Sequence, residues 1–388
     1  NFNEHFNGGS FIFNKKKIWR AIQVLIKDKI NNIIIVAGGT GGHIFPALAV
    51  INCLKKMSLN ARIVTDARGY KIIGKTYQSI IKIPSKGFEG KNIFNKGISI
   101  FLILLGTIKA LVVLKKFKIR IVLGFGSYVQ VPIMIAAKLL KINIILHEAN
   151  ATIGRANLVF WKHAKLKASC FKLQDIYQKN TNIIGMPVRE EIIKLNNNIF
   201  KISKTDKLNL LIYGGSLGSA NLSLGICLAI CSLPLSTRNK ISVTHQVKAD
   251  DYKEVSKNYL NAAIEAKIKT FFDDISDHYK KANLVISRSG ASAVAELGVV
   301  GLPVIYFPLP NSIGNHQYLN ALKISKKKGA WLFNENEIKT KKFITFLNTL
   351  VNSPKLLIEY ANNNRKIAKP NATKDLCRLI KGVINEIV

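Results

Sequence analysis

Two successive series of short β-branched runs, separated by longer segments of helical periodicity, make up the sequence. The first series extends from IIIVAGG at 33–39 to TNIIG at 181–185, and the second begins with LNLLIYGG at 208–215. Short apolar runs that alternate with helices are typical of parallel strands covered by helices on both faces. The pattern predicts an α/β chain with two Rossmann-like, doubly wound parallel-sheet domains.

The same pattern divides the chain. We expect a basic N-terminal extension over 1–32, a first domain over 33–190, a charged linker over 191–207, and a second domain over 208–370. Residues 371–388 are expected to form a C-terminal helix that packs back on the first domain. Because ligands of open α/β sheets bind at the carboxyl ends of the strands, two such domains facing across a cleft would share one binding site.

The chain is strongly positive. Its 388 residues include 58 Lys and Arg against 22 Asp and Glu, a formal net charge of +36. This charge attracts anionic lipid, phosphorylated substrates or nucleic acid, unless it reflects only a compositional bias toward Lys, Asn and Ile at neutral surface positions. Nucleic-acid-binding surfaces interleave aromatic and basic side chains, and the sequence shows no such interleaving, so no nucleic-acid partner is predicted.

An apolar segment, ISIFLILLGTI at 98–108, is followed by Lys109 and then by the pair Lys115 and Lys116. A membrane-spanning helix needs about 20 apolar residues, so this segment is predicted to be too short and too interrupted to span a bilayer. An apolar helix with basic flanks suits a membrane interface, and a buried core helix is the alternative interpretation.

A glycine-rich turn follows the first strand of each half. The turn at 38–42 precedes His43, and the turn GGSLGS at 214–219 contains Ser216. The spacing in the first turn is not the Gly-x-Gly-x-x-Gly of dinucleotide-binding proteins. Glycines allow a close backbone approach, and the helix that follows offers unpaired N–H groups to an anion. One such turn in each half predicts a nucleotide or phosphosugar site.

Polar residues end two further strands of the first half, in LHEAN at 146–150 and GMPVR at 185–189. Polar side chains buried at mid-strand would be costly, so these are expected to line the cleft. The residues so placed are His147, Glu148, Asn150 and Arg189.

The second half supplies small residues in ASAVAE at 291–296, where a phosphate can approach the helix N-terminus while Glu296 reaches a sugar hydroxyl pair. NHQYLNA at 315–321 places amides near the same site. No Asp-x-Asp pair occurs, and Asp273 and Asp274 lack companion ligands. No metal ion and no cofactor are therefore predicted.

Together these motifs resemble one enzyme family. They occur in the order and spacing of the MurG glycosyltransferases, from Ile33 to the C-terminus: GGTGGHIFPALA, HEAN, GMPVR, GGSLGS, FFDDI, RSGASAVAE and NHQYLNA. The resemblance implies a GT-B fold and inverting, metal-free transfer of N-acetylglucosamine from UDP-N-acetylglucosamine to the 4-hydroxyl of the muramyl sugar of lipid I, undecaprenyl-pyrophosphoryl-MurNAc-pentapeptide. The product would be lipid II, for peptidoglycan synthesis. A peripheral location on the cytoplasmic face of the bacterial inner membrane, against anionic lipids, is also implied.

The resemblance implies donor contacts in both halves. Phe272 matches the residue whose backbone contacts uracil, Glu296 the acid that binds ribose, and Gln317 an amide that helps to hold the donor. The full set of implied substrate-binding residues is Thr40, Gly41, Gly42, Asn150, Arg189, Ser216, Phe272, Ala291, Ser292, Ala293, Val294, Ala295, Glu296 and Gln317.

Two residues are candidates for the general base that takes the proton of the acceptor hydroxyl. Neutral imidazole at His43 suits this task, because the unperturbed pKa of histidine is about 6.5. Glu148 is the alternative base, and His43 would then only orient the turn. At the edges of the site, Ala149, Met186 and Leu217 stand where the family has Gln, Asn and Gln.

Two other functions stay open from the sequence. One is another GT-B enzyme that acts on UDP-N-acetylglucosamine, either with a soluble acceptor or as an epimerase. The other is a non-catalytic, basic, membrane-associated protein. Dependence of turnover on the lipid-linked acceptor separates the three.

Overall fold

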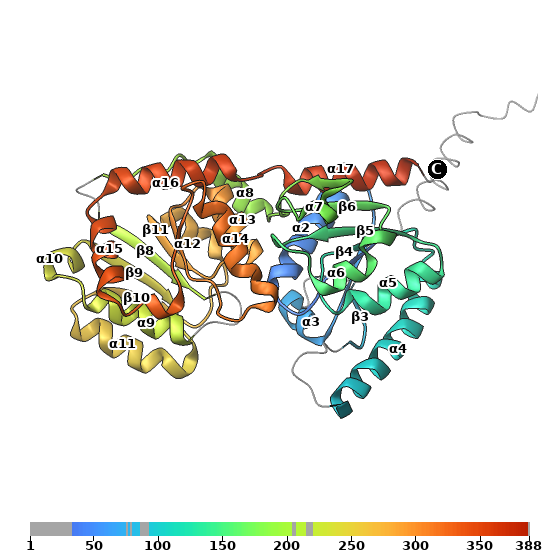
Figure 1. The fold of residues 1–388 in the computed structure, drawn as a ribbon, viewed down its shortest axis with the longest axis horizontal. Coiled ribbons are helices and arrows are strands. Elements are labelled where there is room, and N and C mark those ends of the chain that lie inside the picture. Colours follow the sequence, from blue (N-terminus) through green and yellow to red (C-terminus); the bar gives the residue numbers. More distant parts are fainter. Residues whose placement is uncertain are drawn as a thin grey trace, which may run out of the picture.

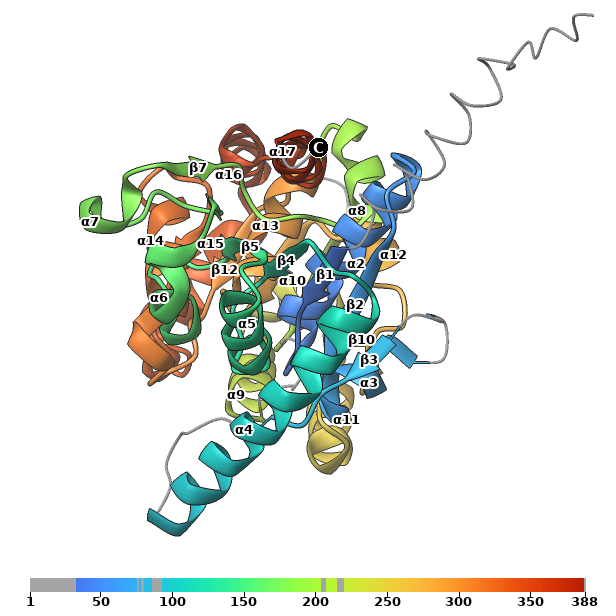
Figure 2. The ribbon, with the colours of Figure 1, turned by 90° about the vertical axis from the view of Figure 1, so that its right-hand side faces the viewer.

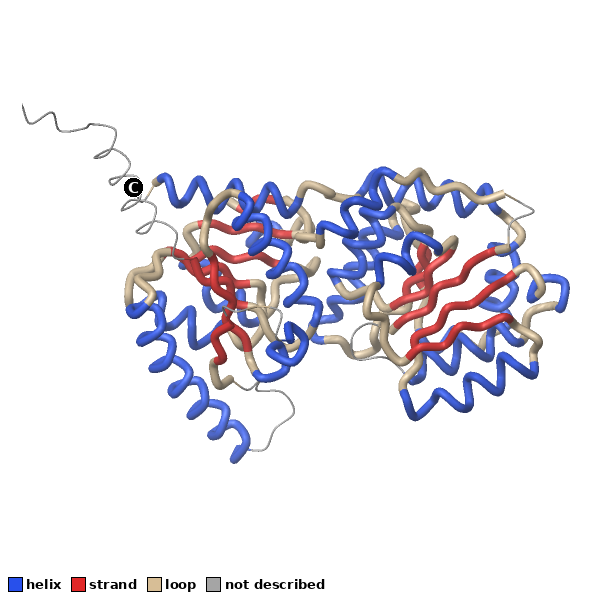
Figure 3. Tube along the Cα trace, turned by 180° about the vertical axis from the view of Figure 1, so that it is seen from behind, coloured by secondary structure: helices blue, strands red, loops and turns tan. Residues whose placement is uncertain are grey.

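The computed structural model describes residues 33–74, 77, 80–85, 93–203, 207–214 and 220–386. The predicted extension 1–32 and the predicted ligand contact Ser216 lie outside these residues. Figure 1 shows two lobes side by side, one for each half of the sequence. In both lobes, helices cover the two faces of a central sheet (Figure 3).

The first domain contains a seven-stranded parallel sheet. Its strand order is β3 (Ile80–Lys82), β2 (Ala61–Thr65), β1 (Ile33–Val36), β4 (Ile121–Gly124), β5 (Asn143–Glu148), β6 (Leu166–Ser169) and β7 (Thr181–Ile183). The connecting helices are α2 (Gly41–Lys56), α3 (Ala67–Ile73), α4 (Ile93–Lys116), α5 (Gln130–Leu139), α6 (Arg155–Phe160) with the 3₁₀ turn η2 (Trp161–His163), and α7 (Asp175–Gln178).

The second domain contains a six-stranded parallel sheet. Its order is β10 (Glu265–Lys269), β9 (Ile241–Gln246), β8 (Leu208–Tyr213), β11 (Leu284–Ser287), β12 (Val304–Tyr306) and β13 (Trp331–Leu332). Its helices are α9 (Ala220–Cys231), α10 (Leu235–Arg238), α11 (Tyr252–Asn261), α12 (Ile275–Lys281), α13 (Ala291–Val300), α14 (His316–Ser325), α15 (Lys341–Val351) and α16 (Pro354–Ile367), with 3₁₀ turns η4 (Ala249–Asp251), η5 (Ile313–Asn315) and η6 (Glu335–Glu337). The predicted fold class is confirmed.

The apolar run of β1 shows why the strands of this fold lack polar alternation. Ile33 and Ile35 face a core formed with α2, whereas Ile34 and Val36 face a second core formed with α5. Successive strand residues point to opposite faces of a sheet, and both faces here are covered by helices. Every side chain of the strand is therefore buried.

The chain crosses between the domains twice. The segment expected to be a linker begins inside helix α8 (Glu190–Lys194) and continues into η3 (Leu195–Asn197), and Ile192 is buried in a core of the second domain. After α16 the chain returns, and α17 (Ala372–Asn385) packs against α2. The two crossings are tied together, because the Thr373 hydroxyl donates to the Val188 carbonyl at 3.0 Å and accepts from the Val188 N–H at 3.1 Å.

The structure corrects the expectation that the apolar segment of the first domain is short and interrupted. Helix α4 is continuous over 24 residues, and Lys109 does not break it. By length and composition, Gly97–Lys116 could cross a membrane, but such a test is also met by core helices of soluble proteins. Only 28% of its most apolar window is buried, which is unlike a core helix. Figure 2 shows α4 projecting away from the body of the domain.

Candidate active site

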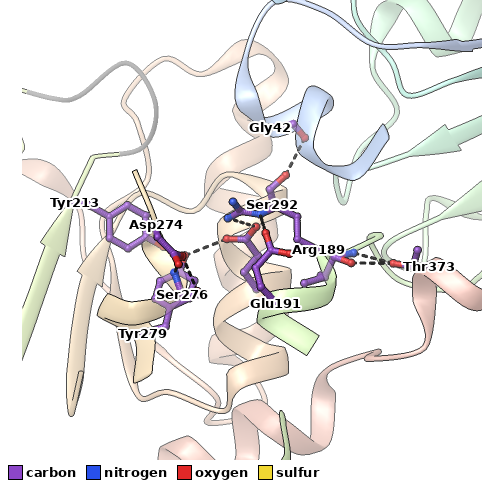
Figure 4. Close-up of polar contacts among 11 residues, drawn as sticks. Gly42, Arg189, Glu191, Tyr213, Asp274, Ser276, Tyr279, Ser292 and Thr373 are labelled. Carbon is purple, nitrogen blue, oxygen red and sulfur yellow. Dashed lines mark hydrogen bonds and ion pairs between the residues drawn. The ribbon is translucent and has the colours of Figure 1, made fainter. Parts of the chain in front are cut away.

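The N-termini of two helices, one from each domain, meet between the domains. Helix α2 follows the turn at 38–42, in which Gly39 has φ 84°, a left-handed conformation that favours glycine. From α13, the Ser292 hydroxyl donates a hydrogen bond of 2.7 Å to the Gly42 carbonyl oxygen (Figure 4). The first N–H groups of a helix lack intrahelical partners and carry partial positive charge. Two such ends together suit an anion such as a diphosphate.

Most of the predicted phosphate contacts lie at these two helix ends. The residues placed there are Thr40, Gly41, Gly42, Ala291, Ser292, Ala293 and Ala295. Val294 lies in the same part of α13, but its side chain is buried in a core of the second domain and its N–H donates to the Gly290 carbonyl oxygen at 3.0 Å, so neither is available to a ligand.

Arg189 adds a cation beside the two helix ends. Its guanidinium lies 3.2 Å from the Glu296 carboxylate and 3.7 Å from that of Glu191 (Figure 4). The guanidinium carbon also lies 4.5 Å from the ring centroid of Phe45 on α2. Arg189 therefore contacts both domains, and its planar group has the geometry that pairs with phosphate oxygens.

Glu296 connects Arg189 to a pair of buried tyrosines. One Glu296 oxygen accepts from Arg189, and the other accepts from the Tyr279 hydroxyl at 3.1 Å. The Tyr279 and Tyr213 hydroxyls lie 2.9 Å apart. Burial raises the pKa of Glu296, and the charge of Arg189 opposes that rise. No motif in the sequence marks the two tyrosines, which occupy ordinary core positions of β8 and α12.

Of the other predicted donor contacts of the second domain, Phe272 lies on the loop after β10 and Gln317 lies at the start of α14. Phe272 is buried, and its ring centroid lies 4.2 Å from that of His278. The side-chain oxygen of Gln317 accepts from the Leu309 N–H at 2.9 Å, so the amide holds the loop that follows β12.

His43 lies in the first turn of α2, beside the turn that follows β4. Its Nδ1 is buried and has no hydrogen-bond partner among the described residues. Burial lowers the pKa of His43 below its ordinary value, a hydrogen bond with the Phe125 backbone opposes this, and nearby His316 lowers it further. The imidazole is thus neutral at neutral pH, the form that can accept a proton.

Glu148 is buried and fully bonded. Its carboxylate accepts from the N–H groups of Asn150 and Gly154, both at 2.9 Å, and from the Asn157 amide at 2.8 Å. Burial raises its pKa, and these hydrogen bonds oppose the rise. Glu148 therefore shapes the loop at 149–154, which carries Asn150. His147, also predicted to line the site, is instead fully buried and bonded through Nε2 to the Gly185 carbonyl oxygen at 2.8 Å.

Asn320 is a buried residue that joins this loop to the second domain. Its side-chain oxygen accepts from the Ala151 N–H at 2.8 Å, and its amide donates to Asn150 at 3.1 Å and to the Ser289 carbonyl oxygen at 3.2 Å. Asn320 belongs to the NHQYLNA segment noted in the sequence, but nothing in that segment distinguishes it from its neighbours. Its importance comes from contacts with residues far away along the chain.

Two buried histidines predict how stability depends on pH. Burial lowers the pKa of His147 to about 4 and that of His245 to about 3, from an ordinary value of 6.5. His245, like His147, is fully buried. Below pH 6.5 the unfolded chain binds protons that the folded chain does not, so the free energy of unfolding should fall as pH decreases from 6.5 toward 4.

Thermal unfolding measured between pH 7.5 and pH 5 tests this expectation. We expect Tm to fall over this range, and the fall should be shallower in His245→Phe, which removes one of the two groups. An unchanged slope in this variant would show that the buried imidazole does not contribute.

Comparisons with known proteins agree with the fold. Residues 33–168 match the glycosyltransferase family 28 N-terminal domain, and residues 209–376 match the C-terminal domain of the same family. A UDP-N-acetylglucosamine--N-acetylmuramyl-(pentapeptide) pyrophosphoryl-undecaprenol N-acetylglucosamine transferase of Francisella philomiragia is 32% identical over 375 residues, covering 93% of this chain and 99% of that protein. The Wolbachia pipientis protein of the same description is 33% identical over 351 residues, covering 90% of this chain and 98% of that protein.

Solved structures give the same result. Acinetobacter baumannii MurG superposes with a TM-score of 0.71 at 27% identity, covering 90% of this chain and 99% of that one. A UDP-GlcNAc 2-epimerase from Neisseria meningitidis, with a TM-score of 0.63 at 15% identity, shares the fold alone and covers 90% of this chain and 99% of that one. From the two matched domains and the near full-length relatives, the chain belongs to glycosyltransferase family 28 and, within it, to the MurG enzymes.

Proposed function

We propose that this enzyme transfers N-acetylglucosamine from UDP-N-acetylglucosamine to lipid I, with lipid II and UDP as products. The meeting of two helix N-termini beside Arg189 carries the proposal, because UDP leaves with a diphosphate whose charge grows during the reaction. The near full-length relatives named for this transfer support the same donor and acceptor.

Inversion at the anomeric carbon requires attack by the acceptor 4-hydroxyl from the face opposite UDP. In the proposed mechanism, neutral His43 takes the proton of that hydroxyl. The N–H groups at the starts of α2 and α13, together with Arg189, stabilise the leaving diphosphate. Each preorganised donor of this kind is worth about 3 to 4 kcal/mol in the transition state. Glu296 is proposed to exchange its tyrosine and arginine partners for the ribose hydroxyls, and Glu148 to hold Asn150 in place.

A transfer assay tests the function. Labelled UDP-N-acetylglucosamine is supplied with lipid I or a short-chain analogue, with EDTA present, and with a parallel reaction that lacks the acceptor. We expect disaccharide product only when the acceptor is present, and no loss of rate with EDTA. Formation of UDP or an epimerised sugar without acceptor would favour the epimerase alternative. Binding of UDP with no product would favour a non-catalytic protein.

Helix α4 is proposed to hold the enzyme at the cytoplasmic face of the membrane, where the lipid-linked acceptor lies. One side of the helix exposes the α4 apolar stripe, defined as Ile100, Phe101, Leu104, Leu105, Ile108 and Val112. The exposed fractions of these side chains range from 42% for Leu105 to 61% for Ile108, although large aliphatic residues are ordinarily buried. Lys109, Lys115 and Lys116 on the same helix can contact anionic headgroups.

Charging the α4 apolar stripe should release the enzyme from membranes. In the triple variant Phe101→Asp, Leu104→Asp and Ile108→Asp, we expect loss of co-sedimentation with vesicles that contain anionic lipid, because the stripe can no longer enter the interface. Transfer to a short-chain, soluble acceptor should continue. A matched control is Leu235→Asp with Leu260→Asp, which charges exposed leucines of the second domain. Unchanged vesicle binding by the triple variant would rule out this membrane contact.

A further inference from the structure

A series of buried polar side chains joins the loop at 149–154 to the turn beside His43. Glu148, which is bonded to that loop, also accepts from the Asn157 amide at 2.8 Å. The Asn157 oxygen accepts from the Gln130 amide at 2.8 Å, and the Gln130 oxygen accepts from the Gly126 N–H at 2.9 Å. Glu148, Asn157 and Gln130 are at most 2% exposed.

The last member of this series lies directly against the proposed base. Gly126 has φ 88°, in the left-handed region that favours glycine. A Cβ added at Gly126 would lie 3.4 Å from the Asn157 amide nitrogen and 3.8 Å from Cε1 of His43. The backbone of the preceding residue, Phe125, is close enough to raise the pKa of His43 against the effect of burial. The backbone of this turn therefore packs directly against the imidazole.

The loop at 149–154, which is bonded to Glu148, contacts the second domain. Asn150 and Ala151, which belong to the loop that Glu148 shapes, are both bonded to Asn320. Hydrogen bonds therefore run without a break from Asn320 of the second domain to Gly126, in the turn beside His43. Because these polar groups are buried, water cannot replace a lost partner.

We propose that Gln130 is a positioning residue that couples domain contact at Asn320 to the placement of His43. The proposal rests on the proposed function, because it assigns His43 the role of base. The hydrogen bonds of the Gln130 side chain among the described residues are with Gly126 and Asn157, both in the first domain. Its two hydrogen bonds keep the Gly126 turn in the conformation that orients the imidazole. They do so only when Asn157 is itself held by its hydrogen bond to Glu148.

The Gln130→Met variant tests this role, because Met has nearly the same volume but can neither accept from Gly126 nor donate to Asn157. We expect kcat for transfer to fall by about ten- to a hundredfold, within the range for displacing a general base, with KM for UDP-N-acetylglucosamine changed less than twofold. A loosened turn exposes the imidazole, so the acid limb of the kcat profile should move to higher pH. Titration of His43 by NMR should show the same movement without any turnover.

Two further variants separate positioning from general destabilisation. Gln130→Glu keeps the acceptor for the Gly126 N–H, and its protonated form also donates to Asn157, so its kcat should partly recover as pH is lowered. Thr237→Val removes a partly buried hydrogen bond of 2.6 Å from the Thr237 hydroxyl on α10 to Asn348 on α15, at the far side of the second domain (Figure 1). It should lower Tm but leave kcat and the acid limb unchanged.

The outcomes are distinct. An unchanged His43 titration in folded Gln130→Met, or an equal change in Thr237→Val, would overturn the positioning role. If Gln130→Met does not fold, an unchanged titration and a wild-type kcat profile in Gln130→Glu would overturn it as well. If the wild type transfers no sugar, the proposed function fails, while the NMR titration still decides whether Gln130 positions His43.

Discussion

The variant His43→Ala should lose about 10²- to 10⁴-fold in kcat, the contribution usual for a general base, while KM for UDP-N-acetylglucosamine stays within a few-fold of the wild type. The imidazole lies at the start of α2, where the first domain meets helix α13 of the second domain. Burial holds its pKa below the ordinary value, so the wild-type rate should remain constant through neutral pH and fall only below pH 6.5. The variant should show no such fall.

Steady-state transfer to a short-chain acceptor over pH 5 to 8 measures both effects. His43→Gln is the matched control, because its amide can still donate a hydrogen bond to the Phe125 backbone but cannot serve as a base. We expect it to be as slow as His43→Ala while binding UDP normally. If either variant kept more than a tenth of the wild-type kcat, the base would lie elsewhere, and Glu148→Gln would be the next variant to measure.

Glu296→Ala should weaken donor binding by about ten- to a hundredfold, because a hydrogen bond to a charged group contributes about 1.5 to 3 kcal/mol. The change removes the proposed acceptor for the ribose hydroxyls, and it also leaves Arg189 and Tyr279 without their shared partner. Calorimetric titration with UDP measures the loss directly, without dependence on turnover. Glu296→Gln, which still accepts from Tyr279, should lie between the wild type and Glu296→Ala.

A nucleotide that lacks the ribose hydroxyls separates the two causes. If Glu296 binds ribose, 2′,3′-dideoxy-UDP should bind the wild type and Glu296→Gln with similar, weakened affinity. If Glu296→Gln weakened the affinity for UDP and for the dideoxy nucleotide by the same factor, Glu296 would act only through Arg189 and the fold of α13.

The sequence predicted those features that leave a local pattern. The glycine turn before His43, the small residues at the start of α13 and the polar ends of β5 all interrupt apolar runs, so their position at strand ends could be inferred. Strands β6 and β13 contain no β-branched residue, so they lack the pattern that marks most of the other strands. Lys109 was taken as a break in α4, although a long lysine side chain can reach solvent from an apolar helix.

Single buried amides left no such pattern. Gln130 and Asn157 are 27 residues apart, and Asn150 and Asn320 are 170 residues apart, yet each pair is hydrogen-bonded. An amide within a helix resembles an ordinary surface residue until the tertiary fold supplies its partner. The same reason explains why His147 was not recognised as buried, since its partners Phe125 and Gly185 belong to other segments of the chain.

Helix α17 has a consequence for how the protein is made. Leu376, Cys377 and Ile380 of this helix are fully buried in the same core as β1 and α2, although more than 300 residues separate them from β1. On a ribosome, the first domain would therefore emerge with part of its core uncovered and would wait for the last helix to be translated. A chain that ends before α17 would lack part of the core of the domain that carries His43, so it should be inactive and not partly active.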